Sequence, residues 1–383
     1  MLKSFLKSKI RFDRNELAGA FGDIGTDFPL VVSLILVGGL DPASVLIMFG
    51  AMQIMTGLIY GIPMPVQPLK AMAVIVITQK LTGNVLYAAG LAIGLTMLFL
   101  TVTNLLAWLG KVIPKCVIRG IQFGLGLQLA ILALKDYVSS DGVSGYILAA
   151  ASFVIVIVLL GNRKYPASLF VIVLGLIYAL ALKINTSALA HGISFSLPQF
   201  HAITPKDMWL GFIILTLPQI PLSIGNSVLA TRQVAEDYFP EKKLGIRKIG
   251  LTYSLMNLIV PFFGGIPVCH GSGGMVGHYT FGGRTGGSVA IYGTMYLILG
   301  LFFSGIFGQA ILLFPKPMLG VILAFEGWAL MKLVKDLKDS RADFGIALLV
   351  GLMAIGLPYG YVIGLAVGTL LAMLVERKII KLS

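Results

Sequence analysis

The third long apolar stretch of the chain opens with GIPMPVQPLK at residues 61–70, and a later one opens with GGIPVCHGSGG at residues 264–274. Both contain the tripeptide Gly-Ile-Pro. Proline lacks a backbone N–H and restricts the residue before it, so both stretches favour extended backbone. Each is predicted to lead into a half-helix, because a helix from Pro68 to Gln79 would rise only about 18 Å, roughly half of a bilayer's hydrocarbon core.

The rest of the chain is apolar enough to need a membrane around it. Of the 383 residues, 57% are hydrophobic and 12% are charged, and the mean hydropathy is +0.94. A soluble domain of this length cannot cover so much apolar surface with polar groups. The apolar runs are continuous, as from Tyr146 to Gly161, whereas the strands of a membrane barrel alternate. An all-α integral membrane protein is therefore predicted.

About 20 residues per span divide the chain into about fourteen transmembrane elements. The first seven are expected at 16–38, 42–60, 63–79, 84–108, 112–134, 145–161 and 166–182, and the second seven at 207–230, 246–263, 267–281, 286–313, 317–333, 342–357 and 359–376. The two proline-rich stretches are then elements 3 and 10. Since seven is odd, the two sets have opposite topology, which predicts two inverted repeats of seven with broken half-helices at these elements.

The distribution of charge fixes the orientation. The net charge is +13, and with the N-terminus inside, the external segments hold only Lys80, Lys135, Lys183, Lys206 and Lys316. Apart from Lys70, which lies within the membrane, the other lysines and arginines are cytoplasmic. This bias predicts a multi-pass protein of the inner cell membrane with both termini cytoplasmic, and it explains the basic charge without nucleic acid.

The two half-helices predict a site for an anion. Helix ends that meet at the midplane would aim unpaired N–H groups and about one positive charge at the same place. Gly271, Gly273 and Gly274 would let oxygen atoms approach closely, although such glycines also serve tight helix packing. The polar residues His270 and Ser272 among them favour the anion site.

Lys70 is the most informative single residue. A lysine at the bilayer centre costs on the order of 3 kcal/mol, and the dipole at the start of its half-helix disfavours a cation. A negative group is therefore expected beside it. That group is either a carboxylate of the first span, where Asp23 and Asp27 share a helix face, or the substrate.

Other polar residues in apolar elements are further candidates. Gln219 and Asn226 of the eighth element could donate hydrogen bonds to an oxyanion or could bond to a neighbouring helix. Glu326 of the twelfth is a candidate proton carrier or a helix-packing residue. No phosphate-binding loop is present, and His278 has no companions at metal-ligand spacing, so neither a cofactor nor a metal is predicted.

Several stretches together resemble the signatures of one family. These are residues 63–70, residues 267–274 continuing to 279–286, FGDIGT at 21–26 and LPQIP at 217–221. They resemble the molybdate transporter family of plants, algae and microbes, a branch related to sulfate permeases, and the similarity spans nearly the whole chain.

The resemblance implies the seven-plus-seven inverted-repeat fold of uracil and sulfate permeases. In that fold a substrate-bearing core domain (1–110 and 207–315) moves like an elevator against a gate domain (111–206 and 316–383), often within a homodimer. The chain departs from many relatives at Gln219 and Asn226, where sulfate and nucleobase permeases carry a carboxylate.

The predicted function is secondary transport of a tetrahedral oxyanion, molybdate ahead of tungstate and sulfate, and not enzymatic catalysis. The candidate substrate-binding residues are Asp23, Thr26, Gln67, Lys70, Gln219, Asn226, His270, Gly271, Ser272 and Gly273, and the candidates for ion coupling are Asp23, Asp27 and Glu326. Transport of sulfate alone, bicarbonate or uracil stays open as an alternative. An ion channel and an intramembrane enzyme using Asp23, Lys70 and His270 are remoter ones.

Overall fold

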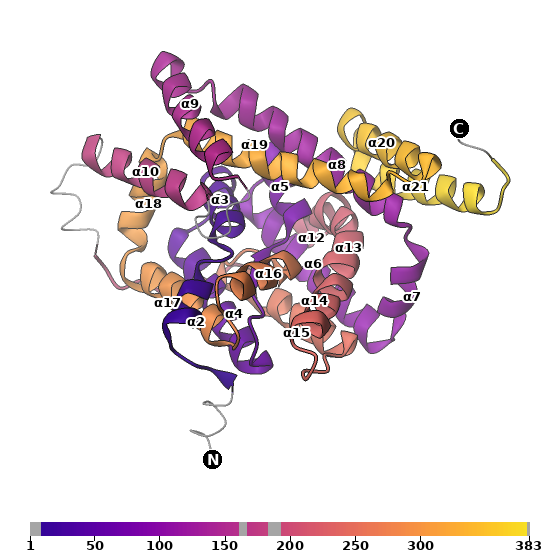
Figure 1. Cartoon of the computed structure of the whole chain (residues 1–383), viewed down its shortest axis with the longest axis horizontal. Coiled ribbons are helices and arrows are strands. Elements are labelled where there is room, and N and C mark those ends of the chain that lie inside the picture. The colour runs from indigo at the N-terminus through magenta and orange to yellow at the C-terminus, as the bar shows by residue number, and fades with distance from the viewer. Residues whose placement is uncertain (1–8, 161–166, 183–192, 381–383) are drawn as a thin grey trace.

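The computed structural model describes residues 9–160, 167–182 and 193–380, so the predicted external Lys183 lies outside the described residues. The described chain is mostly helical, as predicted (Figure 1). Within these ranges two three-residue strands are present, β1 (Val66–Pro68) and β2 (Val268–His270). They fall in the two proline-rich stretches for which extended backbone was predicted.

The helices follow one another through the chain with short breaks. The first half contains α2 (Arg14–Ala20), α3 (Ile24–Gly38), α4 (Pro42–Tyr60), α5 (Lys70–Gln79), α6 (Gly83–Val102), α7 (Leu105–Val112), α8 (Lys115–Leu132), η1 (Ala133–Tyr137), α9 (Gly142–Val158) and α10 (Ala167–Leu182). The second half contains α12 (Pro205–Gly211), η2 (Phe212–Thr216), α13 (Leu217–Leu222), η3 (Ser223–Ala230), α14 (Thr231–Tyr238), α15 (Ile246–Ile259), η4 (Val260–Phe263), α16 (Ser272–Thr280), α17 (Gly287–Phe302), α18 (Ser304–Leu313), α19 (Lys316–Lys332), η5 (Leu333–Leu337), α20 (Arg341–Gly356) and α21 (Gly360–Glu376).

Two helices that were expected to be continuous are broken. The expected span 84–108 is divided into α6 and α7, because Asn104 between them adopts a left-handed conformation with φ of 58°. The expected span 286–313 bends by 95° between α17 and α18. These breaks fall in the fourth and eleventh expected elements, which hold the same place in the two halves.

Five helical runs of the described chain are long and apolar enough to cross a membrane. They are Pro42–Tyr60, Gly83–Val102, Lys115–Tyr137, Pro205–Tyr238 and Lys316–Leu337, and the bent pair of α17 and α18 would make a sixth. Helix α5 is shorter than these, at ten residues. It therefore fits the half-helix that the sequence predicted after the first proline-rich stretch.

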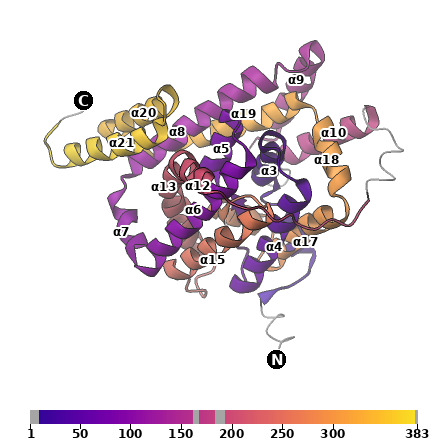
Figure 2. The same cartoon turned by 180° about the vertical axis from the view of Figure 1, so that it is seen from behind.

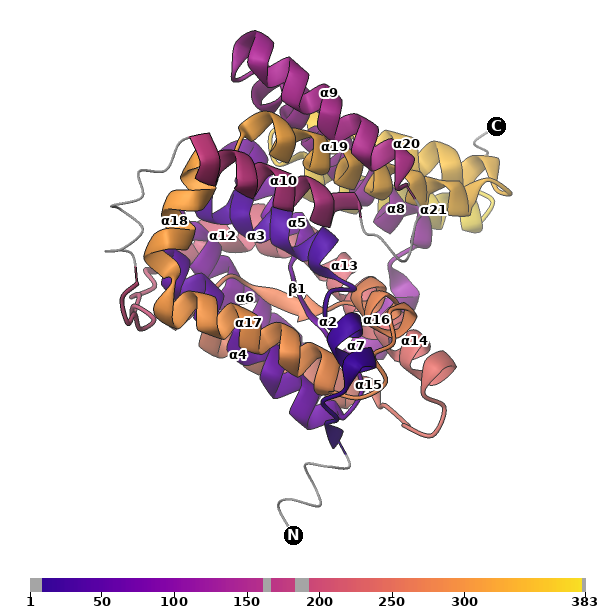
Figure 3. The same ribbon diagram turned by 60° about the vertical axis from the view of Figure 1, so that its left-hand side comes forward.

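The most extensive helix contacts join the two halves of the chain. Helix α4 packs on α17, α6 packs on α15, and α8 packs on both α19 and α20. In Figures 1 and 3, α8, α19, α20 and α21 lie along one side of the molecule, and α4, α6, α15 and α17 lie along the other. From behind, α5 and α13 lie between these two groups (Figure 2).

The two strands pair with each other at the centre of the molecule. They are antiparallel, with Val66 opposite His270 and Pro68 opposite Val268. An amide side chain holds the first residue of each strand. Gln53 on α4 donates to the Val66 carbonyl (2.8 Å) and accepts from its N–H (2.9 Å), and Asn257 on α15 does the same to Val268 at 2.6 and 2.9 Å.

Two further bonds reveal how the two halves correspond. The N–H of Leu69 donates to the Pro267 carbonyl at 3.1 Å, and the N–H of Gly271 donates to the Pro65 carbonyl at 3.4 Å. Pro65 and Pro267 therefore hold equivalent positions, each directly before its strand. The Gly-Ile-Pro echo pairs Pro63 with Pro267 instead, so it is displaced by two residues from the structural correspondence.

We expect Gln53→Leu to destabilise the protein by about 2–6 kcal/mol, because it leaves one buried N–H and one buried carbonyl of Val66 unpaired. The thermal unfolding midpoint in detergent measures this loss. Gln79→Leu is the matched control, since Gln79 is exposed at the end of α5. Equal midpoints for the two variants would show that the Gln53 bonds do not hold the strand.

Candidate functional site

A cavity of about 340 Å³ lies where the two half-helices begin. It is lined by Gln67, Lys70, Arg119, Gln219, Leu222, Asn226, Ser227, Ala230, Cys269, His270, Gly271, Ser272, Gly273 and Leu333. These residues include all the candidate substrate-binding residues except Asp23 and Thr26. Asp23 lies behind Gln67, whose Nε2 donates to both of its carboxylate oxygens at 2.8 and 2.7 Å, and the Thr26 side chain lies outside the described residues.

Lys70 is the first residue of α5 and lines this cavity. Among the residues that the structure describes, none forms an ion pair with it. Its ammonium is close enough to Asp27 and Glu326 for their charges to interact. The two partners that the sequence left open for Lys70, a carboxylate of the first span and the substrate, therefore both stay predictions.

The N-terminus of α5 is already capped by a side chain. Gln219 Oε1 accepts from the N–H groups of Ala71 (3.0 Å) and Met72 (3.3 Å). The other end of the same amide, Nε2, donates to Ser223 Oγ at 3.1 Å. Gln219 thus makes the interhelical bonds that were the alternative to direct oxyanion binding, and it occupies two of the first three N–H donors of α5.

The N-terminus of α16 has its donors free. No described residue accepts a hydrogen bond from the N–H of Ser272, Gly273 or Gly274, the first three residues of the helix. A Cβ on Gly273 would meet no atom within 4 Å, so this residue faces open space. The predicted helix-end donors are therefore present on one half-helix of the two.

The other two glycines serve packing, which was the alternative for them. A Cβ on Gly271 would lie 2.2 Å from the amide carbon of Gln67, and one on Gly274 would lie 2.1 Å from Asp23 Oδ2. The absence of these side chains lets the Gln67–Asp23 pair sit against the start of α16.

Three carboxylates gather beside Lys70. Asp23 and Asp27 interact electrostatically with each other and with Glu326, which approaches from α19. We call Asp23, Asp27 and Glu326 the acid cluster. Asp27 Oδ2 is buried and has no hydrogen-bond partner among the described residues. The structure thus brings the three predicted coupling candidates together.

His270 is held by bonds to helices outside the cavity. Its Nε2 lies 2.7 Å from the Thr252 hydroxyl, and its ring packs edge-on against Tyr60. The imidazole is fully buried between α4 and α15. The side chain therefore fixes β2 to these helices, whereas Asn226, for which no side-chain bond to a described residue is present, stays available to the cavity.

Arg119 lines the cavity from α8 and was not among the predicted site residues. The charge distribution had placed it among the cytoplasmic residues. The signal was its position about two turns inside the expected span 112–134, where an arginine is costly.

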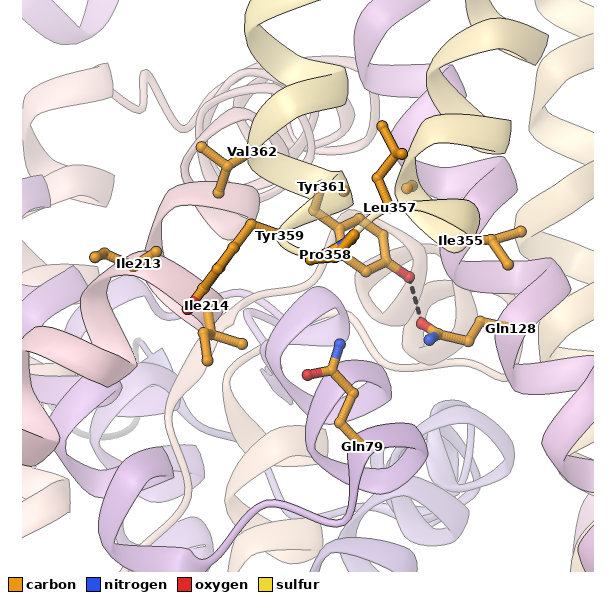
Figure 4. A pocket seen from close by; sticks show the side chains of 12 residues that line it. Gln79, Gln128, Ile213, Ile214, Ile355, Leu357, Pro358, Tyr359, Tyr361 and Val362 are labelled. Atoms are coloured by element: carbon orange, nitrogen blue, oxygen red, sulfur yellow. Dashed lines mark hydrogen bonds between the residues drawn. The ribbon is translucent and has the colours of Figure 1, made fainter.

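A second cavity, of about 360 Å³, lies at the other end of α5 (Figure 4). Gln79, the last residue of α5, faces the turn between α20 and α21 there. Figure 4 shows Tyr361 directed at Gln128, to whose Oε1 its hydroxyl donates at 2.6 Å. Helix α5 therefore separates two cavities, with Lys70 at one and Gln79 at the other.

Solved membrane transporters have the fold of the described chain. Murine Slc26a9, an anion transporter in the inward-facing state, superimposes with a TM-score of 0.71 at 16% identity, over 100% of this chain and 71% of that one. The transmembrane domain of the cyanobacterial bicarbonate transporter BicA gives 0.66 at 17% identity, over 95% and 98%.

The sequence comparison identifies the family. Residues 15–129 and 211–330 match the family model described as "Molybdate transporter of MFS superfamily". Molybdate transporter 2 of Arabidopsis thaliana is 34% identical over 86% of this chain and 81% of its own length, and Molybdate transporter 1 of that plant is 32% identical over 89% and 84%. The chain belongs to the molybdate transporter family, which confirms the resemblance.

Alanine substitutions at Gly271 and Gly273 should differ in their effect on stability. Gly271→Ala collides with Gln67 and should lower the thermal unfolding midpoint, whereas Gly273→Ala meets no atom and should leave the midpoint within about 1 °C of that of the original protein, a stability change under about 1 kcal/mol. Differential scanning fluorimetry in detergent measures both. A larger loss in Gly273→Ala than in Gly271→Ala would contradict the packing described for these two residues.

Proposed function

We propose that the chain is a secondary transporter of a tetrahedral oxyanion, with molybdate the main substrate and tungstate and sulfate as further ones. The observation that carries the proposal is the cavity between Lys70 and the free N–H groups of α16. Membership of a family whose relatives are named molybdate transporters supports it.

Charge compensation explains why such a cavity suits an oxyanion. Lys70 supplies one positive charge and the α16 end supplies about half of one. An unpaired dianion is costly to bury in a medium of low dielectric constant, so it needs opposite charge and donors in contact with it. Backbone N–H groups beside Gly273 can reach its oxygen atoms without a side chain in the way.

The alternatives lack comparable support. A uracil site would be expected to have an aromatic stacking wall, and no Phe, Tyr or Trp stands among the described residues that line the cavity. Sulfate and bicarbonate share the negative charge and the oxygen atoms, so competition measurements must separate them from molybdate. An enzyme or a channel finds no support in relatives that are named as transporters.

We further propose fourteen elements in two inverted repeats, with the core domain (1–110 and 207–315) moving like an elevator against the gate domain (111–206 and 316–383). The matching bonds that Gln53 and Asn257 make to the first residues of β1 and β2 support the repeat. The cavity lies between core residues such as Lys70 and the gate residues Arg119 and Leu333. We also propose that the protein lies in the cell membrane with both termini cytoplasmic. The homodimer stays a prediction.

The acid cluster supplies the groups for coupling in this proposal. Its three carboxylates lie beside Lys70 and come from both proposed domains, so a change in their protonation would alter the charge that the anion meets. Which ion binds there would follow from the dependence of uptake on pH and on sodium.

The proposal predicts a definite order of binding. On purified protein, isothermal titration calorimetry should give binding of molybdate and tungstate, which compete with each other, weaker binding of sulfate and still weaker binding of phosphate. Uracil should not bind. Binding of uracil without any oxyanion would overturn the proposed function.

Lys70→Ala should weaken molybdate binding by about 2–4 kcal/mol, because it removes the cation from a largely desolvated contact. This corresponds to a loss of affinity of about thirtyfold or more. Lys70→Arg should restore only part of it, since a planar guanidinium is bulkier than an ammonium.

Lys80→Ala is the matched control for this measurement. Lys80 stands at the opposite end of α5, exposed, with Asp136 at 3.8 Å. Its loss should leave the affinity within about twofold. Well-folded Lys70→Ala protein with the original molybdate affinity would remove Lys70 from the site.

A further inference from the structure

Arg119 brings a second cation to the cavity from the other side. Lys70 enters it from α5, and Arg119 enters it from α8. The Arg119 side chain is only 16% exposed. An arginine placed this way is costly in a membrane protein unless it has partners, so its hydrogen bonds indicate what it does.

The guanidinium of Arg119 has two partners and spare capacity. Its Nη1 donates to Gln122 Oε1 at 2.8 Å, and its Nη2 donates to Asp336 Oδ2 at 2.5 Å. The buried Nε has no acceptor among the described residues. Since a guanidinium carries five N–H donors, Arg119 can bond to another acceptor in the cavity.

Asp336 has a second cation close by. Lys115 Nζ lies 3.6 Å from the Oδ2 atom to which Arg119 donates. If Arg119 turns toward an anion, Lys115 still neutralises this carboxylate. The movement therefore leaves no carboxylate without a cation. An unpaired buried charge is the usual cost of breaking a salt bridge.

The cavity also needs the charge that Arg119 carries. Gln219 occupies the first donors of α5, so a dianion there meets one unit of charge from Lys70 and about half a unit from α16. About half a unit of negative charge stays uncompensated, and more where a carboxylate of the acid cluster is ionised. A singly charged anion needs one unit less of positive charge than a dianion does.

We infer that Arg119 is the residue that makes this site selective for doubly charged oxyanions, moving between Asp336 and the bound anion. The inference rests on the proposed function. It assigns a specificity-determining role to a residue of the proposed gate, whereas Lys70 and α16 belong to the proposed core.

The test compares two tetrahedral oxyanions of similar size and different charge, molybdate (−2) and perrhenate (−1), by calorimetry on the full-length protein. In Arg119→Gln the affinity for molybdate should fall at least tenfold, and that for perrhenate should fall less than threefold. Equal losses for both anions, or no loss for molybdate, would overturn the inference.

Asp336→Asn separates this role from a purely structural one, because it breaks the same ion pair and keeps the cation. Its molybdate affinity should hold or rise. If it falls as far as in Arg119→Gln, Arg119 only ties α8 to η5 and the inference is wrong. Arg232→Gln is the matched control, since it breaks the Arg232–Glu236 pair of α14 and should change neither affinity by more than about twofold.

A folding defect in Arg119→Gln leaves the test intact. The double variant Arg119→Gln/Asp336→Asn removes both members of the ion pair, and it should show the selective molybdate loss that Asp336→Asn lacks. An unchanged ratio of the two affinities in the double variant would contradict the inference. Absence of molybdate binding by the original protein would instead overturn the proposed function.

Discussion

The central constraint on this molecule is that two stretches of extended backbone must pair all their N–H and carbonyl groups where water is absent. A helix does this within itself, but proline-rich segments cannot. Here β1 and β2 pair with each other, Gln53 and Asn257 bond to their outer edges, and Leu69 and Gly271 donate across to Pro267 and Pro65. Because the two strands satisfy each other's backbone groups by pairing, the half-helices that follow them begin side by side.

The strand pair and its bonds to Gln53 and Asn257 are nearly symmetric, but the chemistry placed on them is not. One half-helix begins with a lysine and is capped by Gln219, and the other begins with Ser272 and Gly273 and has uncapped donors. A fully symmetric site would present either two cations or two bare helix ends. Under the proposed function, an anion would meet a charged side chain on one flank and a set of backbone donors on the other.

Much of this could be predicted from the sequence, because the signals were local. Hydrophobic length placed α4 at the expected residues 42–60, and the prolines marked the strands. The orientation of side chains could not be predicted, since it depends on contacts between distant segments. Gln219 caps α5 across 148 positions, and Arg119 reaches Asp336 across 217. The Gly-Ile-Pro echo was a true signal of correspondence, but it was two residues out of register.

The strand pair also has a mechanical consequence. The β1–β2 hydrogen bonds join α5 and α16, and the amides of Gln53 and Asn257 attach this joint to α4 and α15. A rocking motion that separated the two halves of the chain would have to break the β1–β2 hydrogen bonds in a medium that offers no replacement for them. Sliding the joined segments together as one rigid block breaks none of these bonds. The hydrogen bonds beside the proposed anion site thus also restrict the directions in which that site can move.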